Sequence, residues 1–190
     1  MPVAAILLAA GSARRFGDEK LLAPYRGRAL YEHGLEALAA CALVDEIVVV
    51  VRPGLPLPPE RPRVRFIANP EHAEGMGSSL RAGVRAAGAD AEAWLIALAD
   101  MPDVTAGLIA ALIAAWRTTG KPILVPIHRG RRGHPVVFGG GLRERLLEIR
   151  GDVGARGILE AHPEMVGEFP TDDPAVLFDV DTRADLERRR

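Results

Sequence analysis

The sequence predicts an α/β fold in which a mostly parallel central sheet lies between two layers of helices. Several short runs are almost entirely apolar, as strands are when both faces of their sheet are covered. The segments between these runs carry apolar residues at helical spacing. This alternation is typical of a three-layer, Rossmann-like domain. The predicted strands are 3–9, 46–51, 64–68, 93–99 and 122–127.

Helices are predicted between these strands. Leu108, Leu112 and Trp116 lie on one stripe of a helix. Beyond residue 128 the pattern is less regular: 133–138 is compatible with a strand, and 139–149 with a glycine turn followed by a helix. The proline-rich segment 52–63 is interpreted as a surface loop. The helices are predicted at about 28–41, about 77–88 and about 103–117.

Length and composition predict a single globular domain over residues 1–190. Apolar residues make up 48% and charged residues 26%, and the formal net charge is −1. This composition excludes a disordered chain and argues against a nucleic-acid-binding surface. Cys41 is the only cysteine, so an internal disulfide or a cysteine-based metal cluster is excluded, and we expect Cys41 to pack in the core.

The apolar runs indicate a protein of the cytoplasm. They are shorter than the ~20 residues that span a membrane. The N-terminus also lacks the basic segment and the cleavage site of a secretion signal. We therefore expect a cytoplasmic protein without a membrane partner.

In the segment AILLAAGSARRFGDEKLLAP (5–24), small residues and then cations follow the first predicted strand. Ligands of such sheets bind beyond the carboxyl ends of the strands. Small residues let backbone N–H groups approach an anion, and arginine or lysine neutralises phosphate. The segment is neither a P-loop nor a GxGxxG fingerprint. It predicts a phosphate-binding loop, with a solvated glycine turn as the alternative.

The same segment, LAAGSARRFGDEKLL, resembles the signature of the MobA-like nucleotidyltransferases, with Phe16 in place of the usual methionine. Further segments of this superfamily follow in the expected order, and together they resemble its molybdenum cofactor cytidylyltransferase branch over nearly the whole chain. These segments are NPEHAEGMGSSLRAGV (69–84), LADMP (98–102), GHPVVF (133–138), GDVGAR (151–156) and DVDTRADL (179–186).

The resemblance implies that CMP is transferred from CTP to the phosphate of molybdopterin or molybdenum cofactor, with release of pyrophosphate. Both reacting phosphates are anionic, so catalysis consists chiefly of positioning and charge stabilisation. Lys20, Arg15 and Asp100 are implied as catalytic residues, with Lys20 placed to stabilise charge on the α-phosphate and on pyrophosphate. The implied nucleotide-binding residues are Ala9, Ala10, Gly11, Ser12, Arg15, Lys20, Gly75 and Ser79.

The cofactor implied is Mg²⁺, with Asp100 and Asp181 as ligands. Asp100 follows a predicted strand, and Asp181 alternates with inward-facing apolar residues, so both carboxylates are expected at the nucleotide edge. Asp179 is interpreted as the structural member of its pair. Helix capping is the alternative for Asp100 and Asp181.

The acceptor residues implied are His134 and Arg132, with a solvated surface as the alternative for the arginine. A helix cap is the alternative role for Ser79. Ala10 stands where the guanine-using branch typically has glycine, which favours CTP over GTP. The expected partners are CTP, a phosphorylated pterin and a molybdenum enzyme or its chaperone.

Other functions remain open at this point. Guanylyltransfer to molybdenum cofactor and cytidylyltransfer to another small phosphorylated acceptor share the chemistry. A metal-dependent glycosyltransferase would use DVD (179–181) as its D-x-D motif. A non-catalytic delivery protein for molybdenum enzymes would bind nucleotide without turnover.

Overall fold

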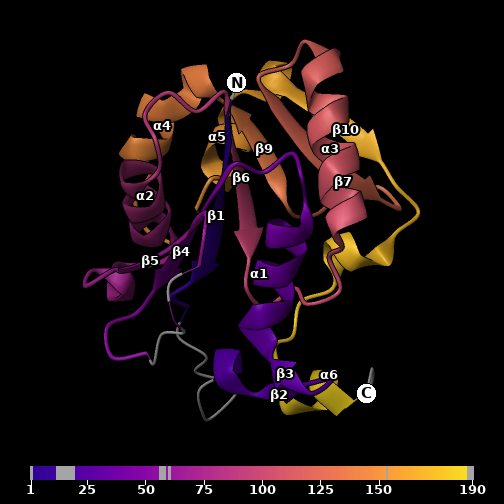
Figure 1. Cartoon of the computed structure of the whole chain (residues 1–190). Coiled ribbons are helices and arrows are strands. Elements are labelled where there is room, and N and C mark those ends of the chain that lie inside the picture. Colours follow the sequence, from indigo (N-terminus) through magenta and orange to yellow (C-terminus); the bar gives the residue numbers. More distant parts are fainter. Residues whose placement is uncertain (1, 12–19, 56–58, 60, 153, 188–190) are drawn as a thin grey trace.

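A twisted central sheet organises the computed structural model, which describes residues 2–11, 20–55, 59, 61–152 and 154–187 (Figure 1). The strand order is β10–β7–β9–β6–β1–β4–β5, and β8 pairs with β7 at the side. The strands are β1 Val3–Ala9, β2 Pro24–Tyr25, β3 Arg28–Ala29, β4 Glu46–Val51, β5 Val64–Ala68, β6 Ala93–Leu98, β7 Ile123–His128, β8 Arg131–Arg132, β9 Val136–Gly139 and β10 Val166–Pro170. The helices are α1 Leu30–Ala40, α2 Met76–Ala86, α3 Ala106–Thr119, α4 Arg143–Glu148, α5 Arg156–Ala161 and α6 Arg183–Glu187.

The sheet is mostly parallel, as its apolar strands predict. β1 pairs in parallel with both β4 and β6, β4 pairs in parallel with β5, and β7 does so with β10. β9 is antiparallel to both of its neighbours, β6 and β7. The carboxyl ends of β1, β4, β5, β6 and β7 therefore share one edge of the sheet, and β9 begins at that edge.

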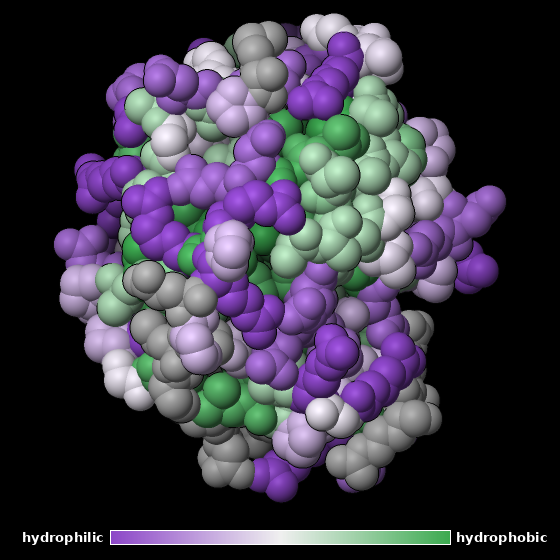
Figure 2. Space-filling model, in the orientation of Figure 1, coloured by the Kyte–Doolittle hydropathy of each residue, from purple (hydrophilic) through white to green (hydrophobic). Residues whose placement is uncertain are grey.

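Helices cover both faces of the sheet, so the fold has the three layers predicted. Alternate residues of β1 divide between two cores. Leu7 belongs to the core that includes buried residues of α1 and α3, and Ile6 to the core that includes residues of α2, α4 and α5. Figure 2 shows that apolar surface gathers over α3, whereas hydrophilic residues cover much of the same view.

A small third core joins the β2–β3 hairpin to the C-terminal helix. It consists of Tyr25, Leu30, Val180 and Leu186. The backbone N–H of Val180 also donates to the carbonyl of Asp100 at 2.9 Å. These contacts hold the segment before α6 beside the end of β6.

The sequence located the main elements well. All five predicted strands and all three predicted helices are present, with ends that differ by three residues or fewer. The compatible strand and helix after residue 128 are β9 and α4, and Cys41 is buried in the core as expected. The β2–β3 hairpin, β10 and α5 were not predicted. No helix among the described residues has the length and apolar character needed to cross a membrane.

We predict that two glycine-to-alanine substitutions change stability in opposite directions. In α2, a Cβ on Gly83 would overlap with Ile6 and would also lie 3.1 Å from a methyl carbon of Val50. Gly83→Ala should therefore lower stability by about 1–3 kcal/mol, despite the better helix propensity of alanine. In α3, Gly107 is exposed, and its Cβ would have 3.9 Å to the nearest atom. Gly107→Ala should raise stability by up to about 1 kcal/mol.

Chemical denaturation of the two variants and the unchanged protein measures both effects. Equal stability of the Gly83→Ala and Gly107→Ala proteins would contradict the close contact between α2 and the strand residues Ile6 and Val50.

Candidate functional site

Two cavities meet at the carboxyl edge of the sheet. The first, here called the glycine-lined cavity, has a volume of about 500 Å³, and the second, the apolar cavity, about 550 Å³. They share the lining residues Leu8, Met76, Leu98 and Asp152. The glycine-lined cavity is also bordered by Ala10, Gly11, His72, Ala73, Gly75, Ser79 and Asp100.

The end of β1 contributes small residues to the glycine-lined cavity, as the sequence predicts. Ala10 and Gly11 line it directly. Ala9 instead packs its methyl group in the core with α1 and α3, so a contact between Ala9 and a nucleotide would have to come from its backbone. Ser12 and Arg15 lie outside the described residues.

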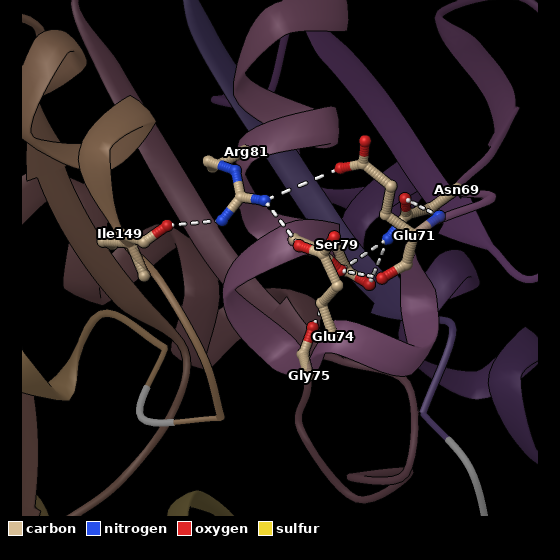
Figure 3. Close-up of polar contacts among 8 residues, drawn as sticks. Asn69, Glu71, Glu74, Gly75, Ser79, Arg81 and Ile149 are labelled. Carbon is tan, nitrogen blue, oxygen red and sulfur yellow. Dashed lines mark hydrogen bonds and ion pairs between the residues drawn. The ribbon is translucent and has the colours of Figure 1, made fainter.

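The start of α2 forms the opposite wall. Asn69 is buried, and its Nδ2 donates to the hydroxyl oxygens of Ser78 at 2.9 Å and Ser79 at 3.0 Å. The hydroxyl of Ser78 donates in turn to the carbonyl of Gly75. Ser78 therefore has a structural role at the start of α2. Ser79 lines the cavity, as does Gly75, so these two predicted nucleotide residues do lie together (Figure 3).

Three carboxylates converge beside the glycine-lined cavity. One oxygen each from Asp100, Asp179 and Asp181 lies within 4.8 Å of the others. The Nζ of Lys20 lies 2.8 Å from Asp100 Oδ2 and 3.6 Å from Asp181 Oδ1. Lys20, Asp100 and Asp181, which were predicted as one site from three distant parts of the sequence, are therefore in contact.

Local structure explains why the two C-terminal carboxylates point the same way. The alternation expected for this segment holds, because Val180 is fully buried between Asp179 and Asp181. The turn before α6 is held by another residue, since Asp185 Oδ2 accepts from the backbone N–H groups of Asp181 and Thr182. The structure thus adds Asp179 to the cluster. The D-x-D alternation was the signal for it, although Asp179 had been interpreted as structural.

The cluster has the composition of a divalent-cation site. Oxygen ligands from several carboxylates are what Mg²⁺ or a similar hard cation prefers. Partial burial raises the pKa of Asp179, and the negative charges of Asp181 and Asp100 raise it further, whereas Lys20 lowers it. Among the described residues, the ammonium group of Lys20 contacts Asp100 and Asp181 and lies close enough to Asp179 to lower its pKa.

The apolar cavity lies on the other side of the shared wall. Its walls are largely aliphatic, with Ile96, Val136 and Phe138 from β6 and β9, and its charged residues include Arg131 and Arg132 of β8. His134 lines it as well, so the two predicted acceptor residues lie in one cavity. Burial lowers the pKa of His134, and the negative charge of Asp100 opposes that shift, which favours a neutral imidazole.

Comparison with known proteins identifies the family of this chain. Residues 5–166 match the family model described as a MobA-like NTP transferase domain. The chain is 32% identical to nicotine blue oxidoreductase from Paenarthrobacter nicotinovorans, covering 98% of this chain and 95% of that protein. It is 28% identical to a probable molybdenum cofactor guanylyltransferase from Thermococcus gammatolerans, covering 95% of each. The crystal structure of Rv0371c from Mycobacterium tuberculosis H37Rv in complex with manganese is similar, with a TM-score of 0.79 at 23% identity over 99% of this chain and 97% of that one.

We predict that Asp179→Asn stabilises the protein at neutral pH when divalent cations are removed with EDTA. The folded state holds the Asp179 proton more tightly than the unfolded state, whose aspartates ionise near pH 3.9. Ionisation of Asp179 therefore opposes folding above that pH. The melting temperature of Asp179→Asn should exceed that of the unchanged protein at pH 7, and the difference should shrink as the pH falls towards about 4.

Asp90→Asn is the matched control, because Asp90 is an exposed carboxylate outside the cluster. It should leave the melting temperature nearly unchanged. A melting temperature of Asp179→Asn equal to or below that of the unchanged protein at pH 7 would contradict the crowding of negative charge at this site.

Proposed function

Because the chain belongs to the family of MobA-like NTP transferase domains, we propose that it transfers CMP from CTP to the phosphate of molybdopterin or molybdenum cofactor. The family makes the protein a nucleotidyltransferase. The observation that carries the proposal is the contact of Lys20 with Asp100 and Asp181 beside two adjoining cavities. We propose that residues 1–190 act as one domain in the cytoplasm and that the product passes to a molybdenum enzyme or its chaperone.

The proposed cofactor is Mg²⁺, held by Asp100, Asp179 and Asp181. Their mutual approach within 4.8 Å supports this ligand set. The related Rv0371c structure contains manganese, a cation with the same preference for oxygen ligands. When bound, such a cation supplies neutralisation of phosphate charge.

The residues divide the proposed reaction between them. The small residues Ala10 and Gly11 give the nucleotide close access to the backbone at the end of β1. An oxygen of the acceptor phosphate attacks the α-phosphorus of CTP, the bond from that phosphorus to the pyrophosphate oxygen breaks, and pyrophosphate leaves. Lys20 stabilises the charge that develops on the α-phosphate and on the leaving group.

The acceptor side is assigned to the apolar cavity. His134 and Arg132 line it, so a neutral ring nitrogen and a guanidinium are available to a phosphorylated heterocycle. Arg15 is proposed to bind the triphosphate, as the family pattern implies.

The rival functions differ in what they release. Guanylyltransfer or another phosphorylated acceptor would also release pyrophosphate, but with a different substrate pair. A glycosyltransferase, a delivery protein, or a redox enzyme like the one named for the Paenarthrobacter relative would release none. The decisive experiment is therefore a panel of CTP, GTP, ATP and UTP against molybdenum cofactor and smaller phosphorylated acceptors, with pyrophosphate as the readout. CTP with molybdenum cofactor should give the highest kcat/KM.

We predict that Lys20→Ala lowers kcat by about 100-fold or more, the scale for loss of one preorganised donor to a transition state. The side chain is only 11% exposed and neutralises the acidic cluster, so the variant should also be less stable in EDTA and regain stability with Mg²⁺. The control is Lys121→Ala, because the Lys121 ammonium binds a carbonyl far from the site. Full activity of a folded Lys20→Ala protein would remove Lys20 from the catalytic residues.

We predict that Ala10→Gly increases the use of GTP relative to CTP. Ala10 is 2% exposed, belongs to the core that includes residues of α2 and lines the glycine-lined cavity, and we propose that its methyl group narrows the space for a base. A single methyl group in a pocket changes selectivity by about 1–3 kcal/mol, which corresponds to roughly 10- to 200-fold. The ratio of kcat/KM for the two nucleotides measures the effect. An unchanged ratio would show that Ala10 does not select the base.

A further inference from the structure

The segment 151–156, GDVGAR, has no part in the chemistry proposed above, although its described residues Asp152, Ala155 and Arg156 line the cavities. Asp152 lines both cavities, and Arg156 lines the apolar one. Met76, the first residue of α2, is also shared and is the large hydrophobic residue that remains exposed in the described part of the chain. A ligand in either cavity would therefore face Asp152.

Gly77 in α2 and Gly75, the N-cap of α2, allow residues 151 and 152 to approach the start of this helix closely. The backbone N–H of Gly77 donates to the carbonyl of Gly151 at 2.9 Å. A Cβ on Gly77 would lie 2.8 Å from that carbonyl oxygen, and a Cβ on Gly75 would overlap with the carboxylate of Asp152. The glycines thus place Asp152 directly against the wall of the glycine-lined cavity.

The buried side chain of Arg81 also holds the chain that leads into Asp152. The side chain of Arg81, in α2, is 4% exposed, and its Nη1 donates to the carbonyl of Ile149 at 2.5 Å (Figure 3). Its Nη2 donates to Glu74 Oε2 at 3.2 Å and lies 3.6 Å from Glu71 Oε2. One guanidinium therefore ties the chain before Asp152 to the chain before Gly75, and the position of Asp152 is defined from both sides.

The carboxylate of Asp152 itself has no hydrogen bond or ion pair with the described residues. The other acidic residue of the apolar cavity, Glu160, is paired with Arg156 at 2.7 Å. An ionised carboxylate only accepts hydrogen bonds, and its two oxygens match two adjacent N–H donors. Asp152 is thus an exposed, positioned acceptor at the junction of the cavities, and none of the residues that the structure describes pairs with its carboxylate.

We propose that Asp152 binds the donor edge of a 2-amino-4-oxopyrimidine ring, in which a ring N–H and an amino group lie side by side. The inference rests on the proposed function, in which the acceptor is a pterin that carries this edge. Guanine carries the same edge, so the ring could belong to either substrate. The apolar walls, including Met76, Leu80 and Leu159, offer surface for the faces of such a ring. Because these apolar walls belong to the cavity assigned to the acceptor, they favour the pterin over guanine as the source of the ring.

Binding without turnover tests the proposal. The dissociation constants of pterin and of lumazine, its analogue with an oxo group in place of the amino group, are measured by fluorescence for the full chain. The unchanged protein should bind pterin about 10-fold more tightly than lumazine. Asp152→Asn should lose this preference, whereas the control Glu160→Gln should keep it. Circular dichroism and melting temperature verify that both variants fold.

A second arm identifies the source of the ring. GTP is compared with ITP, which lacks the amino group of guanine, on the same proteins. If Asp152→Asn loses the preference for pterin, the ring is that of the acceptor, and if it loses only a preference for GTP over ITP, the ring is guanine. If the unchanged protein prefers neither amino compound, or Asp152→Asn retains every preference, the proposal is overturned.

The pyrophosphate assay separates this inference from the proposed function. An Asp152-dependent preference for pterin without pyrophosphate from any substrate pair would leave the binding role standing and refute the nucleotidyl transfer. Pyrophosphate formed with another acceptor, together with no ring preference, would refute the binding role alone.

Discussion

The contact between one ammonium group and a cluster of carboxylates is the interaction on which the rest of the site depends. Lys20 reaches Asp100 at 2.8 Å and Asp181 at 3.6 Å, and Asp179 lies in the same cluster. These residues come from the beginning, middle and end of the chain. The parallel sheet brings the first two to one edge, and the backbone hydrogen bond from Val180 to Asp100 brings the third part alongside.

Burial and the negative charges of Asp181 and Asp100 oppose the ionisation of Asp179 in the folded protein, as its raised pKa indicates. Three acidic groups near one another raise the free energy of the folded state unless cations offset their charge. Lys20 supplies part of this compensation, which explains why a residue expected to act on phosphate is also buried among carboxylates. A cation that bound here would offset this repulsion and would therefore stabilise the folded protein.

The sequence revealed most of the sheet and much of the site, for identifiable reasons. Strands that are covered on both faces consist of continuous apolar runs, as 3–9 and 46–51 do. The positions of these strands could therefore be predicted from the sequence. β10 was missed because its residues, VGEFP, are only partly buried and carry no apolar run. The alternation of residues 178–181 predicts that Asp179 and Asp181 point to the same side. It does not predict how far Asp179 lies from Asp100, so the sequence alone did not assign Asp179 to the acidic cluster. The contact of Arg81 with Ile149 joins residues 68 apart, and no local pattern predicts such a pair.

The reversed strand β9 has a consequence for how such a protein can diversify. Because β9 runs against β6 and β7, its first residue, Val136, and the β8 hairpin before it reach the edge that the neighbouring strands reach with their last residues. The wall of the apolar cavity therefore consists largely of residues 131–160, whereas the wall of the glycine-lined cavity consists mainly of residues from the first hundred. Apart from Asp152, which lines both cavities, the residues of this later segment that line the apolar cavity do not line the other cavity, so changes at them alter one half of the cleft. A lineage could thus exchange one substrate for another while retaining the machinery that activates its nucleotide.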